Sequence, residues 1–194
     1  MTRKHAASLC DYMLALAITW IVIVIGAPCL HAQKSGPTEN EVKSAYLYNF
    51  GKFVEWPAKA TSVGEFFPIC VLGDDTFGST LETTIARESI SGKKVLVKRV
   101  PKPQDALSCR ILFISSSQQS RLKEILAELD NTSVLTVSDM PGFTRRGGMI
   151  QFVVEANKVR FEVNLTSAER TGLTLSSQLL KVAIDVKRSA PPGG

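Results

Sequence analysis

Two short polar stretches hold the residues best suited to binding a ligand or an ion. Asp74 and Asp75 follow one long apolar run, and Ser115 and Ser116 follow another. Carboxylates at a strand end could hold a divalent cation, and serines at a helix start could bind an anion through backbone N–H groups. However, a metal site made of oxygen ligands needs more converging groups, and Asp and Ser are ordinary helix caps. We therefore predict no metal site and treat the four residues as a candidate ligand crevice at the strand ends.

The first 32 residues have the pattern of a secretory signal peptide. Arg3 and Lys4 precede an apolar run at 14–27, and Ala32 offers a small residue before the cleavage point. That apolar run is short for a membrane span of about 20 residues, although an uncleaved anchor is the alternative. We expect cleavage near Ala32 and export from the cytoplasm. The chain then divides into a signal peptide (1–32), a flexible leader (33–37), one domain (38–188) and a disordered tail (189–194).

Cleavage would remove both histidines, His5 and His31. The mature chain then lacks any Ser-His-Asp or Cys-His nucleophilic pair and any imidazole metal ligand. A lone acid or a serine–lysine pair stays open, but no spacing supports one. The formal net charge is +5, with basic residues scattered along the chain and 7% aromatic residues, which argues against nucleic acid as a partner. We predict a binding protein that is not an enzyme and has no cofactor.

Two cysteines, Cys70 and Cys109, remain after removal of the signal segment. In an exported protein they lie in an oxidising compartment, and they allow one intramolecular connectivity. A bridge that closes a loop of about 40 residues would stabilise the fold by about 4 kcal/mol. The alternative is a pair of buried free thiols.

The periodicity predicts an α/β fold, a single three-layer domain with a mostly parallel central sheet plus a C-terminal antiparallel hairpin. Thr38 and Glu41 form a capping box, and the helix that follows carries an apolar stripe through Phe50, with Leu47 facing away from it. Apolar strands alternate with helices after that. The expected strands are 67–73, 93–100, 109–115 and 133–139, and two further helices are expected at about 166–172 and 176–187.

Residues 147–165 form the hairpin, because apolar side chains recur with period two on both arms. The register sets Gln151 against Glu162 and Val153 against Arg160. Alanine at position 156 fits poorly into a two-residue turn that needs positive φ, so a four-residue loop is equally compatible. The polar face with Arg160 and Glu162 could be an active site, a contact surface or a solvated face, and the last is the default.

Several stretches together resemble the YfiR family of periplasmic proteins. The likeness runs from about Ala45 to Ala183. The stretches are AYLYNFGKFVEWP, ICVLGDDTFG, GKKVLVKR, CRILFIS, VLTVSD followed by GF, GGMIQFVVEANKVRFEVNL and ERTGLTLSSQLLKVA.

The resemblance implies a single α/β domain that forms a homodimer and has no enzymatic activity. It implies binding to the periplasmic domain of an inner-membrane diguanylate cyclase, or a related signalling protein, so that cyclic di-GMP is limited. It also implies that Cys70 and Cys109 form the structural bridge. The family's repressor has a further cysteine pair before the last hairpin, and the stretch SDMPGFTRRGGM has none, which counts against redox-controlled release.

A repressor needs a contact surface, and the hairpin with the segments after it is our candidate. We expect its contact residues to be Arg160, Glu162, Leu173, Leu175 and Leu179. The competing hypothesis is a periplasmic sensor domain that binds a small ligand in the crevice at Asp74, Asp75, Ser115 and Ser116.

Overall fold

The computed structural model describes residues 36–58 and 64–188. The expected signal peptide, the first residues of the leader and the tail 189–194 lie outside the described residues. In the described ranges, no helix combines the length and the apolar composition that a membrane span requires.

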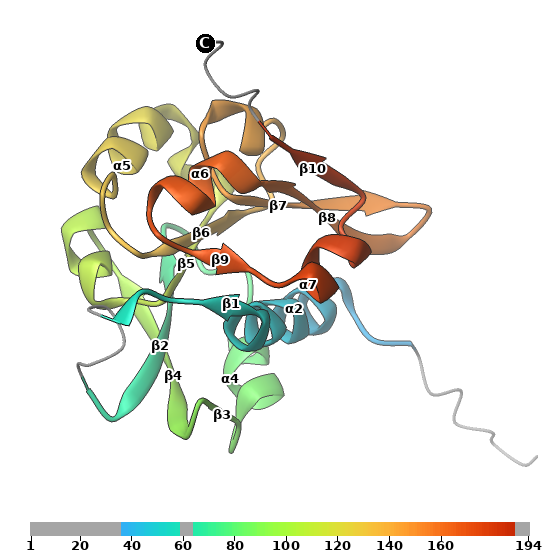
Figure 1. Cartoon of the computed structure of the whole chain (residues 1–194). Helices are drawn as coiled ribbons and strands as arrows, with labels where there is room; N and C mark the ends of the chain where they lie inside the picture. The colour runs from blue at the N-terminus through green and yellow to red at the C-terminus, as the bar shows by residue number, and fades with distance from the viewer. Residues whose placement is uncertain (1–35, 59–63, 189–194) are drawn as a thin grey trace, which may run out of the picture. The chain divides into compact units, whose positions relative to one another are not determined.

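A mixed eight-stranded sheet forms the centre of the domain, in the order β10-β8-β7-β6-β5-β2-β4-β3. Five neighbouring strands, β7, β6, β5, β2 and β4, run parallel to one another. Strand β10 is parallel to β8, whereas the β7–β8 and β3–β4 pairs are antiparallel. Figure 1 shows β10 and β8 at one end of the sheet and β4 and β3 at the other. The α/β prediction with a mostly parallel sheet is confirmed. The strands are β2 (Phe66–Leu72), β3 (Ser89–Ile90), β4 (Lys93–Val100), β5 (Ile111–Ile114), β6 (Leu135–Ser138), β7 (Ile150–Glu155), β8 (Lys158–Asn164) and β10 (Asp185–Lys187).

Helices and short 3₁₀ turns connect the strands. A second, two-stranded sheet pairs β1 (Val54–Glu55) with β9 (Thr174–Leu175). The α-helices are α2 (Glu39–Phe53), α4 (Thr80–Ile85), α5 (Leu122–Glu128), α6 (Leu165–Arg170) and α7 (Ser177–Val182), and the 3₁₀ turns are η1 (Pro103–Ser108), η2 (Ser116–Arg121) and η3 (Thr144–Arg146).

Two apolar clusters lie on opposite faces of the sheet. On β2, Ile69 and Val71 belong to the cluster under α2 and α4, while Cys70 and Leu72 belong to the cluster under α5. A strand covered on both faces carries apolar residues without alternation, which is why its sequence is a continuous apolar run.

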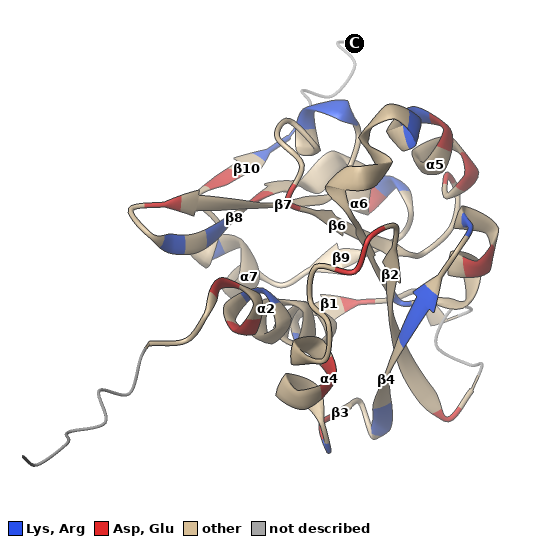
Figure 2. Ribbon diagram, turned by 180° about the vertical axis from the view of Figure 1, so that it is seen from behind, with Lys and Arg blue, Asp and Glu red and all other residues tan. Residues whose placement is uncertain are grey.

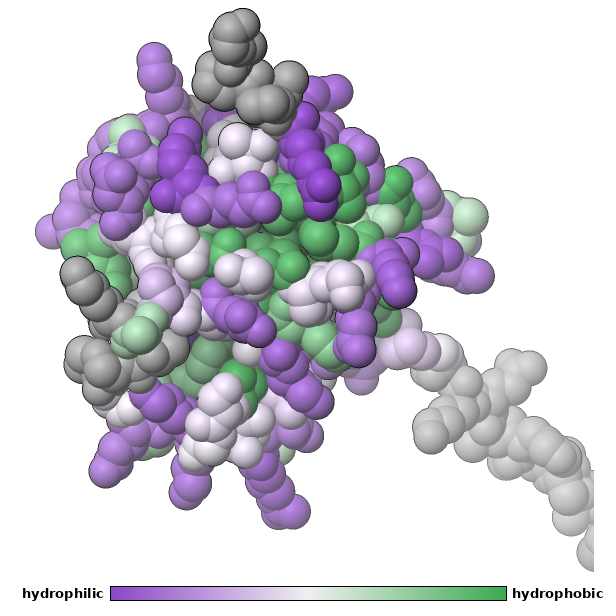
Figure 3. Space-filling view, viewed as in Figure 1, coloured by the Kyte–Doolittle hydropathy of each residue, from purple (hydrophilic) through white to green (hydrophobic). Residues whose placement is uncertain are grey.

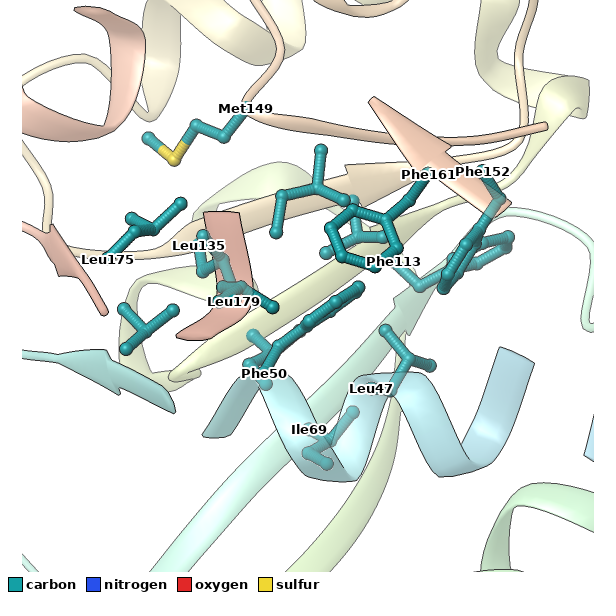
Figure 4. Packing of buried hydrophobic residues seen from close by; sticks show 14 of the residues in the cluster. Leu47, Phe50, Ile69, Phe113, Leu135, Met149, Phe152, Phe161, Leu175 and Leu179 are labelled. Carbon is teal, nitrogen blue, oxygen red and sulfur yellow. The ribbon is translucent and has the colours of Figure 1, made fainter. Parts of the chain in front are cut away.

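Helix α2 begins with the predicted capping box. The Thr38 side chain accepts a hydrogen bond from the Glu41 backbone N–H, and the Glu41 carboxylate accepts one from the Thr38 N–H. Phe50 packs between Phe152 and Phe161, with ring centroids 5.8 and 5.1 Å away (Figure 4). Leu47, which the sequence placed away from the apolar stripe, is fully buried beside Phe50. A helix that is apolar nearly all round is expected to be buried on two sides, and α2 is.

The hairpin has the predicted register, with Gln151 opposite Glu162 and Val153 opposite Arg160. Its connection is the two-residue turn, with Ala156 at φ 47° and Asn157 at φ 59°. Asn tolerates this conformation, whereas Ala adopts it at a cost, which the ladder of six cross-strand pairs offsets.

The expected C-terminal helix over 176–187 is shorter than predicted. Helix α7 ends at Val182, and residues 185–187 form β10, which pairs parallel with β8 from Glu162 to Asn164. Leu179, Leu180, Ala183 and Val186 have helical spacing, but Ile184 N–H bonds the Phe161 carbonyl and turns the chain into the sheet. Tertiary pairing overrides the local pattern here.

Candidate functional site

The carboxyl ends of β2, β5 and β6 bring the predicted crevice residues to one edge of the sheet. The Asp74 backbone N–H donates to Ser117 Oγ at 3.0 Å, which joins the loop after β2 to the turn after β5. Ligands of open α/β sheets usually bind at this edge.

Asp75 and Ser115 are occupied by structural contacts. Asp75 Oδ1 accepts from the Phe77 and Gly78 N–H groups at 2.9 and 3.2 Å, and its other oxygen lies 2.6 Å from Arg99 Nη2. The Ser115 side chain accepts from the Ser117 N–H and is almost completely buried. Both side chains therefore organise turns: Ser115 caps η2, whereas Asp75 closes the turn before α4 without being its N-cap. In the described ranges, no group of three or more acids, cysteines or histidines is placed to hold a metal ion.

A cleft of about 470 Å³ lies beside this edge, and Ser116 is the predicted crevice residue that lines it. Lys43, Glu39, Asp139 and Gln151 line it as well. The Lys43 side chain is 7% exposed, and its Nζ lies 2.8 Å from Asp139 Oδ2 and 2.6 Å from Glu39 Oε1. The charges in this part of the cleft are thus arranged as an internal ion-pair cluster.

The environment of Lys43 keeps its ammonium group charged. Burial lowers the pKa of Lys43, but hydrogen bonds and charges from Asp139 and Glu39 outweigh burial, and the pKa is raised overall. A lysine that acts as a nucleophile or base near neutral pH needs a lowered pKa. Lys43 is therefore suited to positioning α2 against the end of β6, not to covalent chemistry.

The polar face of the hairpin is partly covered. Glu162 Oε2 accepts a hydrogen bond from Thr144 Oγ1 at 3.0 Å and lies 3.3 Å from Lys187 Nζ, which also donates to Thr144 at 3.0 Å. Arg160, on the same strand, is exposed. Glu162 is thus held by η3 and β10, whereas Arg160 points to solvent. Figure 2 shows acidic and basic residues side by side along β8 and β10.

The three leucines predicted as contact residues are core residues. Leu173, Leu175 and Leu179 are 1%, 6% and 3% exposed and belong to the main apolar cluster. Their neighbours Val182 and Ile184 are 57% and 41% exposed. Their burial removes them from the predicted contact surface. The sequence did not show this, because which face of α7 is buried depends on its packing against α2.

Val182 ends α7 and Ile184 precedes β10, and the partly buried Leu180, Ala183 and Val186 belong to the same segment. We call these five residues the α7–β10 patch. Figure 3 shows apolar surface over this part of the molecule. Strand β10 is the last strand of the sheet, and within the described ranges no strand pairs with its outer edge. The patch therefore combines exposed apolar side chains with open backbone hydrogen-bonding groups.

A disulfide joins Cys70 in β2 to Cys109 just before β5, with Cα atoms 6.0 Å apart. Both residues are buried in the cluster under α5. The predicted bridge is confirmed, and it ties β2 to the segment that enters the adjacent parallel strand β5 at its amino end.

Comparison with known proteins gives a family and a fold. A sequence profile described as YfiR/HmsC-like matches residues 40–184. Among solved structures, the chain is similar to a conserved domain protein from Vibrio cholerae O1 biovar El Tor, with 12% identity, a TM-score of 0.54, and coverage of 77% of this chain and 60% of that chain. It also matches the ABC domain in complex with L-Trp from Streptococcus pneumoniae, with 14% identity, a TM-score of 0.47, and coverage of 62% and 56%. The chain thus spans about 60% of the length of the Vibrio protein, and that likeness shows the fold alone.

Proposed function

The chain belongs to the YfiR/HmsC-like family, and from this premise we propose that it is a periplasmic regulator of an inner-membrane signalling protein. The partner we propose is the periplasmic domain of a diguanylate cyclase, which the protein binds and represses, so that cyclic di-GMP is limited. The family is a periplasmic regulatory one, and this supports a role in binding.

The observation that carries the proposal is the α7–β10 patch. Val182 and Ile184 are large apolar side chains left at the surface beside an open strand edge. Exposed apolar residues at a sheet edge are a common means of recognising another chain, because the backbone supplies hydrogen bonds and the side chains supply apolar burial. We propose that this patch, with Arg160 nearby on β8, contacts the cyclase.

Repression follows from differential affinity. If the protein binds the inactive conformation of the cyclase more tightly than the active one, binding shifts the cyclase towards the inactive state by that difference alone. A tenfold difference corresponds to about 1.4 kcal/mol. The regulator then needs a surface that fits one conformation, and it needs no nucleophile.

The experiment pairs binding with a cellular readout. The processed protein is mixed with the purified periplasmic domain of a diguanylate cyclase from the same genome, and affinity is measured by calorimetry. Ile184→Asp should weaken binding at least about tenfold, because a carboxylate in a buried contact is costly, and it should raise cellular cyclic di-GMP.

Val154→Asp is the matched control, since Val154 is 53% exposed and lies on β7, outside the α7–β10 patch. It should leave both measurements unchanged. If Ile184→Asp binds as tightly as the native protein, the patch is not the contact surface. If the native protein binds no such cyclase domain, the partner is wrong.

We also propose that the protein forms a homodimer, as the family resemblance implies. Sedimentation equilibrium of the processed protein measures this directly. A molecular mass equal to that of the monomer at all protein concentrations would contradict the proposal.

A further inference from the structure

A second cleft lies at the opposite, amino edge of the parallel strands, away from the α7–β10 patch. It has a volume of about 400 Å³ and is enclosed by the end of α2, the start of β2, the turn between β3 and β4, and Arg110 just before β5. Volumes of this order are typical of small-molecule sites.

Arg110 lines the cleft as a half-buried guanidinium group. In the described ranges, no carboxylate or carbonyl oxygen bonds its side chain, whereas Arg99 binds both Asp75 and Glu82. Burial lowers the pKa of Arg110, and no neighbouring acid counters this effect. A partly desolvated cation without a partner is energetically costly, so an anion placed beside it would be bound favourably.

Trp56 contributes its indole ring to the lining of the same cleft. Its indole Nε1 is buried, and in the part of the chain that the structure describes it is the one buried side-chain nitrogen or oxygen without a hydrogen-bond partner. The ring packs edge-on against Phe67, with centroids 5.3 Å apart. Buried indole N–H groups usually find an acceptor, but this nitrogen lies beneath the surface, so it is the ring of Trp56 that faces a ligand in the cleft.

The remaining wall is apolar and closely packed. Phe67 and Ile90 are buried, and a Cβ atom at Gly51 would lie 2.4 Å from Ile90 Cδ1. Glycine at this position therefore lets α2 approach the floor of the cleft. At the rim, Lys52 adds a positive charge, which Glu55 opposes.

We propose that this cleft binds a small organic anion, a carboxylate with an apolar body. The Arg110 guanidinium pairs with the carboxylate, and the side chains of Trp56, Phe67 and Ile90 contact the apolar part. The proposal is independent of the proposed cyclase partner, because it involves a different face of the domain.

Trp56 also makes the experiment specific. The chain has two tryptophans, and the other, Trp20, lies in the expected signal segment. In the processed protein, fluorescence therefore reports on Trp56 alone. The probes are hexanoate and cyclohexanecarboxylate, each compared with its neutral alcohol, 1-hexanol or cyclohexylmethanol.

At least one acid should change Trp56 fluorescence in a saturable way, and its alcohol should bind at least about tenfold more weakly. Arg110→Gln should weaken binding of the acid by a similar factor. Arg145→Gln is the control, since Arg145 is exposed and lies in η3, away from this cleft, and it should bind the acid as the native protein does.

Circular dichroism verifies that Arg110→Gln is folded, and Arg110→Lys is the second variant if it is not. The lysine variant keeps the positive charge and loses the planar guanidinium group. Its affinity for the acid should therefore lie between two values measured on the native protein, namely the affinity for the acid and the affinity for the alcohol. The proposal is overturned if neither acid saturates, if acid and alcohol bind alike, or if the folded Arg110 variant keeps native affinity.

Discussion

Lys43 Nζ lies 2.8 Å from Asp139 Oδ2, a contact between residues 96 positions apart in the sequence. It joins the first half of α2 to the residue that follows β6. Glu39 lies one turn earlier on α2, and its Oε1 is 2.6 Å from Lys43 Nζ, which completes the cluster. A lysine that is almost fully buried keeps its charge only when such partners are present.

We expect Asp139→Asn to lower the free energy of unfolding by about 1–3 kcal/mol, because it weakens the partner of a buried charge. Urea denaturation of the processed protein measures the change. Glu39→Gln is the comparison, since Glu39 is half exposed and an i,i+4 pair of this kind contributes about 0.2–0.5 kcal/mol. If the two variants lower the free energy of unfolding equally, the contact with Asp139 stabilises the fold no more than the contact with Glu39 does.

The raised pKa of Lys43 predicts where stability is lost at alkaline pH. A basic group whose pKa is raised by folding contributes its full stabilisation below the unfolded value of 10.5, and this is lost as the pH rises through the higher folded pKa. We expect the difference in unfolding free energy between native protein and Lys43→Met to be constant from about pH 7 to about pH 9. It should shrink only above 10.5. A difference that rises as the pH approaches 10.5 would show that the pKa is lowered instead, because the unfolded state would then bind more protons than the folded state.

Removing the disulfide should destabilise the fold without changing it. We expect the double variant Cys70→Ala, Cys109→Ala to lose about 2–5 kcal/mol of unfolding free energy, because the bridge closes a long loop. Reducing agent should lower the melting temperature of the native protein and leave that of the double variant unchanged. If reduction lowers both equally, the effect does not come from this bridge.

Elements with strong local patterns were predictable from the sequence. Strand β4 has its expected bounds at Lys93 and Val100, and the Thr38–Glu41 capping box needs only neighbouring residues. The hairpin register followed from period-two alternation, since a slip of one residue would expose Phe152 and Phe161. In each case the information lies within a few residues or in two adjacent strands.

The candidate site depended on long-range contacts and was less predictable. Burial of Lys43 requires Asp139, and β10 exists because Val186 pairs with Val163 of β8. The half-buried Arg110 follows an ordinary loop and precedes an ordinary apolar strand, so no local signal marked it. Two weak signals were present: Lys43 follows Glu39 at helical spacing, and Trp56 stands just before Pro57, shortly after the end of α2.

Glu162 provides the clearest difference between the sequence-based interpretation and the structure. Its carboxylate is held by Thr144 and Lys187, so Glu162→Arg would place a second positive group beside Lys187 and remove the acceptor of the Thr144 hydroxyl. We expect a loss of about 1–2 kcal/mol in unfolding free energy, moderated because both charged groups are partly exposed. Arg160→Glu, at an exposed position on the same strand, should change stability by less than about 0.5 kcal/mol. If urea denaturation finds Glu162→Arg as stable as the native protein, the contacts with η3 and β10 contribute nothing, and Glu162 becomes available again as a partner contact.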